Sequence, residues 1–218
     1  MQSPISKSEF FSSVTHFIGG GLSIAALVVL VVAAARQASA WHVVSFAIFG
    51  ASLILLYFTS SLYHAIPMLH RARKIFQRID HAFIYVLIAG SYTPITLVAI
   101  RGGLGWSIFG IVWGIAIVGL ILKLRGTVLK GKISATIYVL MGWLGVIAFV
   151  PLSRALSFEG FVWLIIGGAM YTVGAFCFAF DKIIPQGKWI DMHGVFHLFV
   201  MAGSFSHFWM MYQYVLYI

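Results

Sequence analysis

Residues 17–35 read FIGGGLSIAALVVLVVAAA, an apolar run of 19 residues that contains no charged side chain. A helix that crosses a bilayer needs ~20 such residues, whereas the apolar core of a secretory signal peptide has only ~7–15. We therefore expect this run to be a membrane span, although the small residues Ala38-Ser39-Ala40 after it resemble a cleavage site. Of the 218 residues, 61% are hydrophobic and only 9% are charged, against ~25% charged residues in a soluble domain. The sequence thus predicts an integral membrane protein.

Six further apolar runs of similar length follow the first. The seven predicted spans are 15–35, 41–66, 79–100, 104–122, 133–152, 160–180 and 194–217. None shows the strict alternation of apolar and polar residues that marks a β-barrel strand. We therefore expect an all-α fold, a seven-transmembrane helix bundle. The connections are short, which favours antiparallel neighbours in a single domain, residues 1–218.

The basic residues predict the orientation of the bundle. With seven spans, eleven of the 14 Lys and Arg residues lie on the side of the N-terminus, and only Arg36, Arg101 and Arg154 lie on the other. Cytoplasmic loops carry the excess of Lys and Arg, so we expect the N-terminus in the cytoplasm and the C-terminus outside. At this hydropathy, the net charge of +9 indicates contact with anionic lipid headgroups rather than with nucleic acid.

Two prolines and the single cysteine add local expectations. Pro67 follows the second run and is expected to stop its helix, and Pro94 lies inside the third and is expected to kink it. Cys177 is the only cysteine, so it has no partner for a disulfide within the chain, and we expect it to pack as a small apolar residue.

The motif Asp191-Met192-His193-Gly194-Val195-Phe196-His197 opens the last apolar run. Its two histidines are four residues apart, so on a helix they share one face at a spacing that can bind one metal ion. Histidine inside a span is costly unless it faces the protein interior and has a partner. In the predicted topology, His64 ends the second span and Asp80 begins the third, on the same cytoplasmic side. Three helices therefore bring these groups to one depth.

These residues predict a catalytic zinc site. The neutral imidazoles of His64, His193 and His197 would hold Zn²⁺ and leave a fourth position for water, and the lack of a cysteine in this set favours zinc over softer metals. Zinc would lower the pKa of that water to ~7 and polarise a carbonyl. Asp80 would hold and deprotonate the water. Ser60 would donate a hydrogen bond to a developing oxyanion or orient Asp80.

Each of these residues also has a simpler interpretation. A histidine pair at this spacing, taken alone, is often explained by core or interfacial packing. Asp80 could instead pair with Arg78 or Lys182 at the interface, and Ser60 could bond to a carbonyl of its own helix.

Three further polar residues are left with open roles. His16 opens the first span on the same side, as a fourth ligand, a partner of a ligand or an interfacial cap. Glu9, two turns earlier, could cap the helix or form a salt bridge. His207 lies about 15 Å deeper than His197 by helical rise, too far to join the same ion, and we expect it to be a buried hydrogen-bonding group.

The combined pattern resembles the haemolysin III family of bacterial membrane proteins, which belongs with the progestin and adipoQ receptors, including the adiponectin receptors, and is more distantly similar to alkaline ceramidases. The matching stretches are Ser60-Ser61-Leu62-Tyr63-His64, Asp80, Gly90-Ser91-Tyr92-Thr93-Pro94, and His193-Gly194-Val195-Phe196-His197 followed by Ser206-His207-Phe208. The resemblance covers nearly the whole chain, including Glu9 and Thr15-His16 at the first span.

The resemblance implies a multi-pass protein of the bacterial cytoplasmic membrane with zinc near the cytoplasmic leaflet. The implied ligands are His64, His193 and His197, with Asp80 and Ser60 around the bound water. It also implies hydrolysis of a lipid amide such as that of a ceramide. The terminal segments of the receptor branch are missing here, which places hormone recognition in doubt.

Three functions remain open at the level of sequence. The first is a zinc-dependent hydrolase acting on a lipid amide or ester from the inner leaflet. The second is a non-catalytic sensor or regulator of the membrane in which zinc staples helices together. The third is a channel or lytic protein. Membrane lipids are the expected partners, nucleic acid is not expected, and the oligomeric state is left open.

Overall fold

The computed structural model describes residues 5–126, 131–180, 187 and 189–218, and within them it contains helices and connections but no β-strand. The long helices are α1 (Lys7–Gln37), α2 (Ala40–Ala65), α3 (Arg73–Pro94), α4 (Gly103–Leu124), α5 (Gly131–Trp143), α7 (Phe158–Ala179) and α8 (Met192–Gln213). Shorter elements are the π-helix η1 (Ile95–Ala99), the 3₁₀ helix η2 (Leu144–Ala148), the helix α6 (Phe149–Ala155) and the terminal 3₁₀ turn η3 (Val215–Tyr217). The predicted all-α fold is confirmed.

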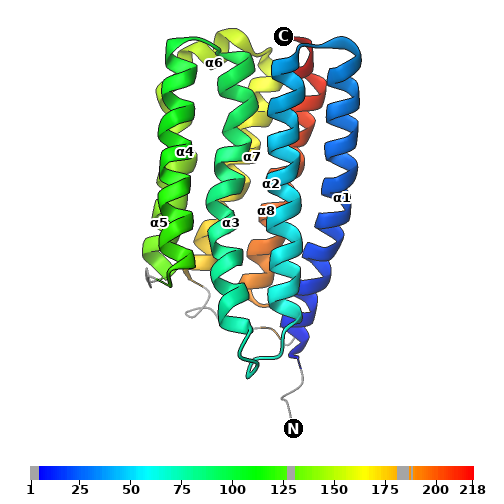
Figure 1. Cartoon of the computed structure of the whole chain (residues 1–218), viewed down its shortest axis with the longest axis vertical. Coiled ribbons are helices and arrows are strands. Elements are labelled where there is room, and N and C mark those ends of the chain that lie inside the picture. The colour runs from blue at the N-terminus through cyan, green and yellow to red at the C-terminus, as the bar shows by residue number, and fades with distance from the viewer. Residues whose placement is uncertain (1–4, 127–130, 181–186, 188) are drawn as a thin grey trace.

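The long helices form one bundle with roughly parallel axes (Figure 1). Along the chain, α1 packs on α2, α2 on α3 and α3 on α4, while α8 packs against both α7 and α1. The α2–α3 connection lies at the end of the bundle where α1 begins, and the C-terminus lies at the opposite end (Figure 1). The beginning of α8 is therefore available to meet the end of α2.

Six helical segments are long and apolar enough to cross a membrane by length and composition: α1, α2, α3 with η1, α4, residues Ile133–Ala155, and α7. They support a multi-pass membrane protein. The helix α8 is as long as α7 at 22 residues but is not among the six, and it contains three histidines. The predicted count of seven spans and the predicted orientation therefore stay predictions. Of the basic residues used for the orientation, Lys130, Lys182 and Lys188 lie outside the described residues.

Two helices begin earlier than their apolar runs. The side chain of Ser6 accepts a hydrogen bond from the backbone N–H of Glu9, so α1 begins at Lys7 rather than at residue 15. Likewise α3 begins at Arg73 rather than at residue 79. Polar residues that seemed to precede the spans are therefore fixed on helices at one end of the bundle.

Three interruptions of the helices lie along the chain, and two of them coincide with a proline. Before Pro67, α2 ends at Ala65, as expected, and Ile66 adopts the extended conformation that a following proline favours. At Pro94 the regular α-helix ends and the chain continues as the π-helical turn η1. The predicted fifth span is broken by η2, a 3₁₀ segment that the apolar pattern did not reveal.

Candidate metal site

The beginning of α8 is fixed by a capping residue. The Asp191 carboxylate accepts a hydrogen bond of 2.7 Å from the backbone N–H of Gly194, which starts the helix at Met192. His193 then lies in the first turn, and His197 follows one turn later on the same face. His64 lies in the last turn of α2. The predicted convergence of these three histidines from two helices is found in the structure.

The three imidazoles face one another closely. One ring nitrogen from each of His64, His193 and His197 lies within 4.8 Å of the others, close enough to hold a single metal ion. The Nε2 atoms of His64 and His193 are 3.2 Å apart. Two nitrogens on a tetrahedral zinc at ~2.0–2.1 Å would be about 3.3 Å apart, so this spacing fits shared ligation. His64 and His197 are buried, and Nδ1 of His197 has no hydrogen-bond partner.

Glu9 fixes the orientation of the His64 ring. Its Oε2 lies 2.8 Å from His64 Nδ1, while its Oε1 accepts a hydrogen bond from the Arg73 guanidinium. A neutral imidazole that donates its Nδ1–H to this carboxylate would present the lone pair of Nε2 to the other two rings. The same guanidinium donates to the carbonyl of Ile66 and lies over the ring of Tyr63. The start of α1, the end of α2 and the start of α3 are thus joined at His64.

His16 stacks on His197. The two rings are nearly parallel, with centroids 3.5 Å apart, and His16 also meets the ring of Tyr57 edge to face. Both ring nitrogens of His16 are buried without a hydrogen-bond partner. His16 is not one of the three histidines whose nitrogens cluster. Of the three roles left open for His16, the stacking favours that of a partner of His197 over that of a fourth metal ligand.

Asp80 and Ser60 lie beside the cluster. Both residues are buried and their side chains are neighbours. Both also line the same cavity as His193 and His197. Asp80 lies outside the group of clustered ligand atoms. Within the described residues it forms no ion pair with Arg78, whereas Lys182, the other partner considered, lies outside them. The hydrogen bonds described for the chain include no bond from Ser60 to its own helix.

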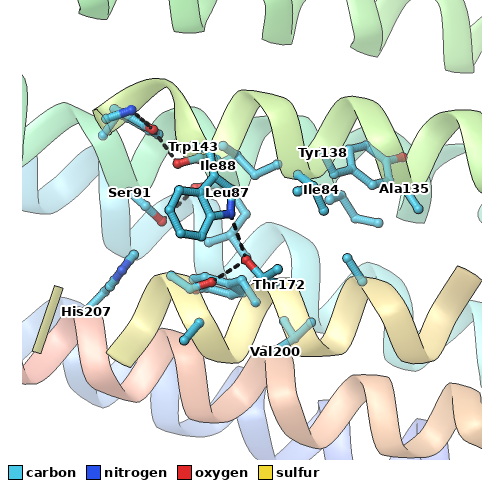
Figure 2. A pocket seen from close by; sticks show the side chains of 18 of the residues that line it. Ile84, Leu87, Ile88, Ser91, Ala135, Tyr138, Trp143, Thr172, Val200 and His207 are labelled. Carbon is cyan, nitrogen blue, oxygen red and sulfur yellow. Dashed lines mark hydrogen bonds between the residues drawn. The ribbon is translucent and has the colours of Figure 1, made fainter. Parts of the chain in front are cut away.

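A largely apolar cavity of about 240 Å³ extends from the histidines along the interior of the bundle, between α3, α5, α7 and α8 (Figure 2). Near the histidines its wall includes Ser60 and Asp80. Tyr138 lines it on the Asp80 side, where its hydroxyl donates to the carbonyl of His81. Farther along, Leu87 and Val200 face it, and at its remote end it reaches His207. The histidine cluster therefore borders a cavity that suits an apolar group better than bulk water.

The sequence left the roles of Glu9 and His16 open; the salt bridge considered for Glu9 is found, but its partners His64 and Arg73 were not predicted. Glu9 precedes the first apolar run and its partner His64 is 55 residues away, so no local spacing connects them. The available signal was weak: Glu9 is one of only five acidic residues, and it lies seven positions before His16. That spacing places both on one face of a helix, but only if the helix extends back to Lys7.

Comparison with known proteins agrees with this architecture. The family model described as "Haemolysin-III related" matches residues 6–208. "Hemolysin-3" of Bacillus cereus is 41% identical over 210 residues, covering 96% of this chain and 93% of that protein. "Hemolysin-3 homolog" of Bacillus subtilis (strain 168) is 43% identical over 203 residues, covering 93% of this chain and 92% of that protein. "Monocyte to macrophage differentiation factor" of Homo sapiens is 25% identical over 179 residues, covering 80% of this chain and 72% of that protein.

Proposed function

The chain belongs to the haemolysin-III-related family, and from this premise we propose that it is a zinc-dependent hydrolase of the bacterial cytoplasmic membrane. Its substrate would be a lipid with an amide bond, as in a ceramide, or an ester bond. The observation that carries this proposal is the convergence of three imidazole nitrogens beside a largely apolar cavity.

The proposed topology has seven spans, with α8 as the seventh. Its 22 residues match the length of α7, against which it packs. Polar residues are tolerated in a span when they face the interior of the bundle, and His197 and His207 are buried there. The excess of Lys and Arg at the end where α1 begins would face the cytoplasm. The histidine cluster would then lie near the cytoplasmic leaflet.

His64, His193 and His197 are the proposed ligands, with Glu9 holding His64 in place. When bound there, zinc would supply a Lewis acid and a bound water that ionises near neutral pH. The Asp80 carboxylate would accept the proton of the attacking water and return it to the leaving nitrogen or oxygen. The Ser60 hydroxyl would keep the Asp80 carboxylate oriented or donate to the oxyanion.

The cavity supports a lipid as the substrate. A lipid amide or ester has one polar carbonyl group attached to long apolar chains. Its carbonyl would lie at the histidines beside Asp80, and an acyl chain would extend along Leu87 and Val200 into the bundle.

The test is metal analysis and lipid turnover of the purified protein with Asp80→Asn. Asp80 lies outside the ligand set, so we expect the variant to retain one zinc per chain. Its turnover of a ceramide should fall at least 100-fold, in line with the 10²–10⁴-fold typical of a general base. Equal turnover by Asp80→Asn and the wild type would contradict the catalytic assignment. His193→Ala should lose the metal itself.

A non-catalytic role is the second candidate, and the contacts of Glu9 favour it. The cluster and its support join the ends of α1, α2, α3 and α8, so a bound metal would also act as a staple. If the zinc-loaded protein hydrolyses no lipid while chelation lowers its thermal unfolding midpoint, the structural role is correct.

A further inference from the structure

His207 is a buried polar side chain at the end of the cavity remote from the metal cluster. It lies on α8, ten residues beyond His197, which corresponds to about 15 Å along the helix axis. Only 7% of the residue is exposed, and neither ring nitrogen has a hydrogen-bond partner. The expectation that His207 would be buried is met, but its expected hydrogen bond within the protein is not found. In Figure 2 the ring projects into the cavity near Ser91, with Tyr138 at the other end of the view.

The bundle has a recess that fits this ring. A Cβ atom added to Gly167 of α7 would lie 2.3 Å from Cδ2 and 2.5 Å from Nε2 of His207. Any larger residue at position 167 would therefore displace the imidazole. The ring of Tyr171 packs against it edge to face, with centroids 5.4 Å apart. The imidazole is thus held in one position, with Gly167 and Tyr171 against it.

The other polar side chains around His207 already have partners. Three hydroxyls each donate a hydrogen bond to a different backbone carbonyl oxygen: those of Ser91, Tyr92 and Thr172. The hydroxyl of Tyr171 is 2.9 Å from that of Ser204, which also accepts a hydrogen bond from Tyr57. Among the described polar side chains that line this end of the cavity, His207 is the exception. A buried polar group without a partner is destabilising, so its retention here needs an explanation.

The surroundings define the chemistry of the missing partner. The backbone of Leu164 interacts with the imidazole, and its carbonyl oxygen can only attract the N–H of the ring. The other nitrogen is then an acceptor that needs a donor. The described residues at this end carry no charge, so a charged ligand group would be buried without a counter-ion. A hydroxyl group is neutral and donates one hydrogen bond.

We propose that His207 is the hydrogen-bond acceptor of a second ligand subsite, which binds a hydroxyl group on the chain of an amphiphilic lipid. The lipid's carbonyl or carboxylate head lies at the histidine cluster and its chain follows the cavity, so the inference rests on the proposed lipid-binding function. The subsite selects chains whose hydroxyl is about 15 Å from the head. It therefore discriminates between hydroxylated and plain chains.

The experiment measures binding of three fatty acids to the zinc-loaded protein in nanodiscs, by displacement of radiolabelled octadecanoic acid. The competitors are octadecanoic acid, 12-hydroxyoctadecanoic acid and 2-hydroxyoctadecanoic acid. One additional neutral hydrogen bond corresponds to an affinity gain of about five-fold. We expect this gain for the 12-hydroxy acid over the plain acid, and none for the 2-hydroxy acid, whose hydroxyl lies beside the head group.

Three variants connect the preference to His207. His207→Leu should bind all three acids within two-fold of one another, and Ser91→Ala, which alters a satisfied hydroxyl at the same end, should keep the preference. If His207→Leu does not fold, Gly167→Ala retains the imidazole but displaces it, and should reduce the preference. Equal binding of the plain and 12-hydroxy acids by the wild type, or a preference that survives in His207→Leu, overturns the subsite and leaves the lipid-binding function intact. Failure of the wild type to bind any of the acids overturns that function together with the subsite.

Discussion

At the scale of single residues, the cluster of three histidines was predictable and the residues that support it were not. His193 and His197 share a local spacing, and His64 joins them once the spans are counted, so sequence alone identifies all three. Glu9 contacts His64 from a helix that is distant in sequence, and the apolar pattern begins only after it. A hydrogen bond between residues 55 positions apart carries no periodic signal.

The contact between Glu9 and His64 leads to a prediction about metal affinity. Glu9→Gln replaces the carboxylate by an amide, which weakens its hold on the Nδ1–H of His64 and leaves the ligands intact. We expect zinc affinity to fall about 10–100-fold, the usual effect of losing such a support, as measured by competition with a chromogenic chelator. Glu159→Gln, in the first turn of α7 and exposed to solvent, is the matched control and should bind zinc like the wild type. Equal affinity in both variants would mean that Glu9 serves only the ion pair with Arg73.

At the scale of helices, the apolar runs gave the number of long segments but not their ends or breaks. Capping by Ser6 extends α1, and capping by Asp191 fixes the residue at which α8 begins. The π-helical turn after Pro94 and the 3₁₀ segment Leu144–Ala148 depend on how neighbouring helices pack. Periodicity does not record such contacts, because it describes one helix at a time.

The contact between α1 and α2 offers a test at this scale. A Cβ atom at Gly50 would lie 2.6 Å from Cδ1 and 3.0 Å from Cα of Leu27, so Gly50→Ala has to push the two helices apart. We expect it to destabilise the protein by about 1–3 kcal/mol, seen as a lower thermal unfolding midpoint in detergent. Gly110→Ala in α4 meets nothing within 4 Å and should be neutral or stabilising by about 0.5–1 kcal/mol. The opposite order of stability would show that α1 and α2 do not pack this closely.

At the scale of the whole molecule, composition predicts a helical membrane protein, whereas its orientation rests on the distribution of charge. Single cysteines in a Cys177→Ser background can test that orientation with a membrane-impermeant maleimide on intact cells. We expect Arg101→Cys, in the α3–α4 connection, and Ile218→Cys, at the C-terminus, to be labelled, because both would face outward. Arg71→Cys, in the α2–α3 connection, should react only after the cells are permeabilised. Labelling of Arg71→Cys without permeabilisation would show that the orientation is the reverse of the predicted one. Protection of Ile218→Cys alongside Arg71→Cys would show that the chain has six spans.

The cap at Ser6 has a practical consequence for work with shortened forms of this protein. Removing the first turn of α1 would leave every histidine in the polypeptide, yet it would strip His64 of its carboxylate partner and Arg73 of its counter-ion. If a trimmed fragment still inserts in membranes but no longer retains metal, the cause would be the loss of the Glu9 contact with His64, and the ligand assignment would still stand. The shortest fragment suitable for metal studies starts no later than Ser6, and an affinity tag is better fused at the opposite end of the bundle, after Ile218.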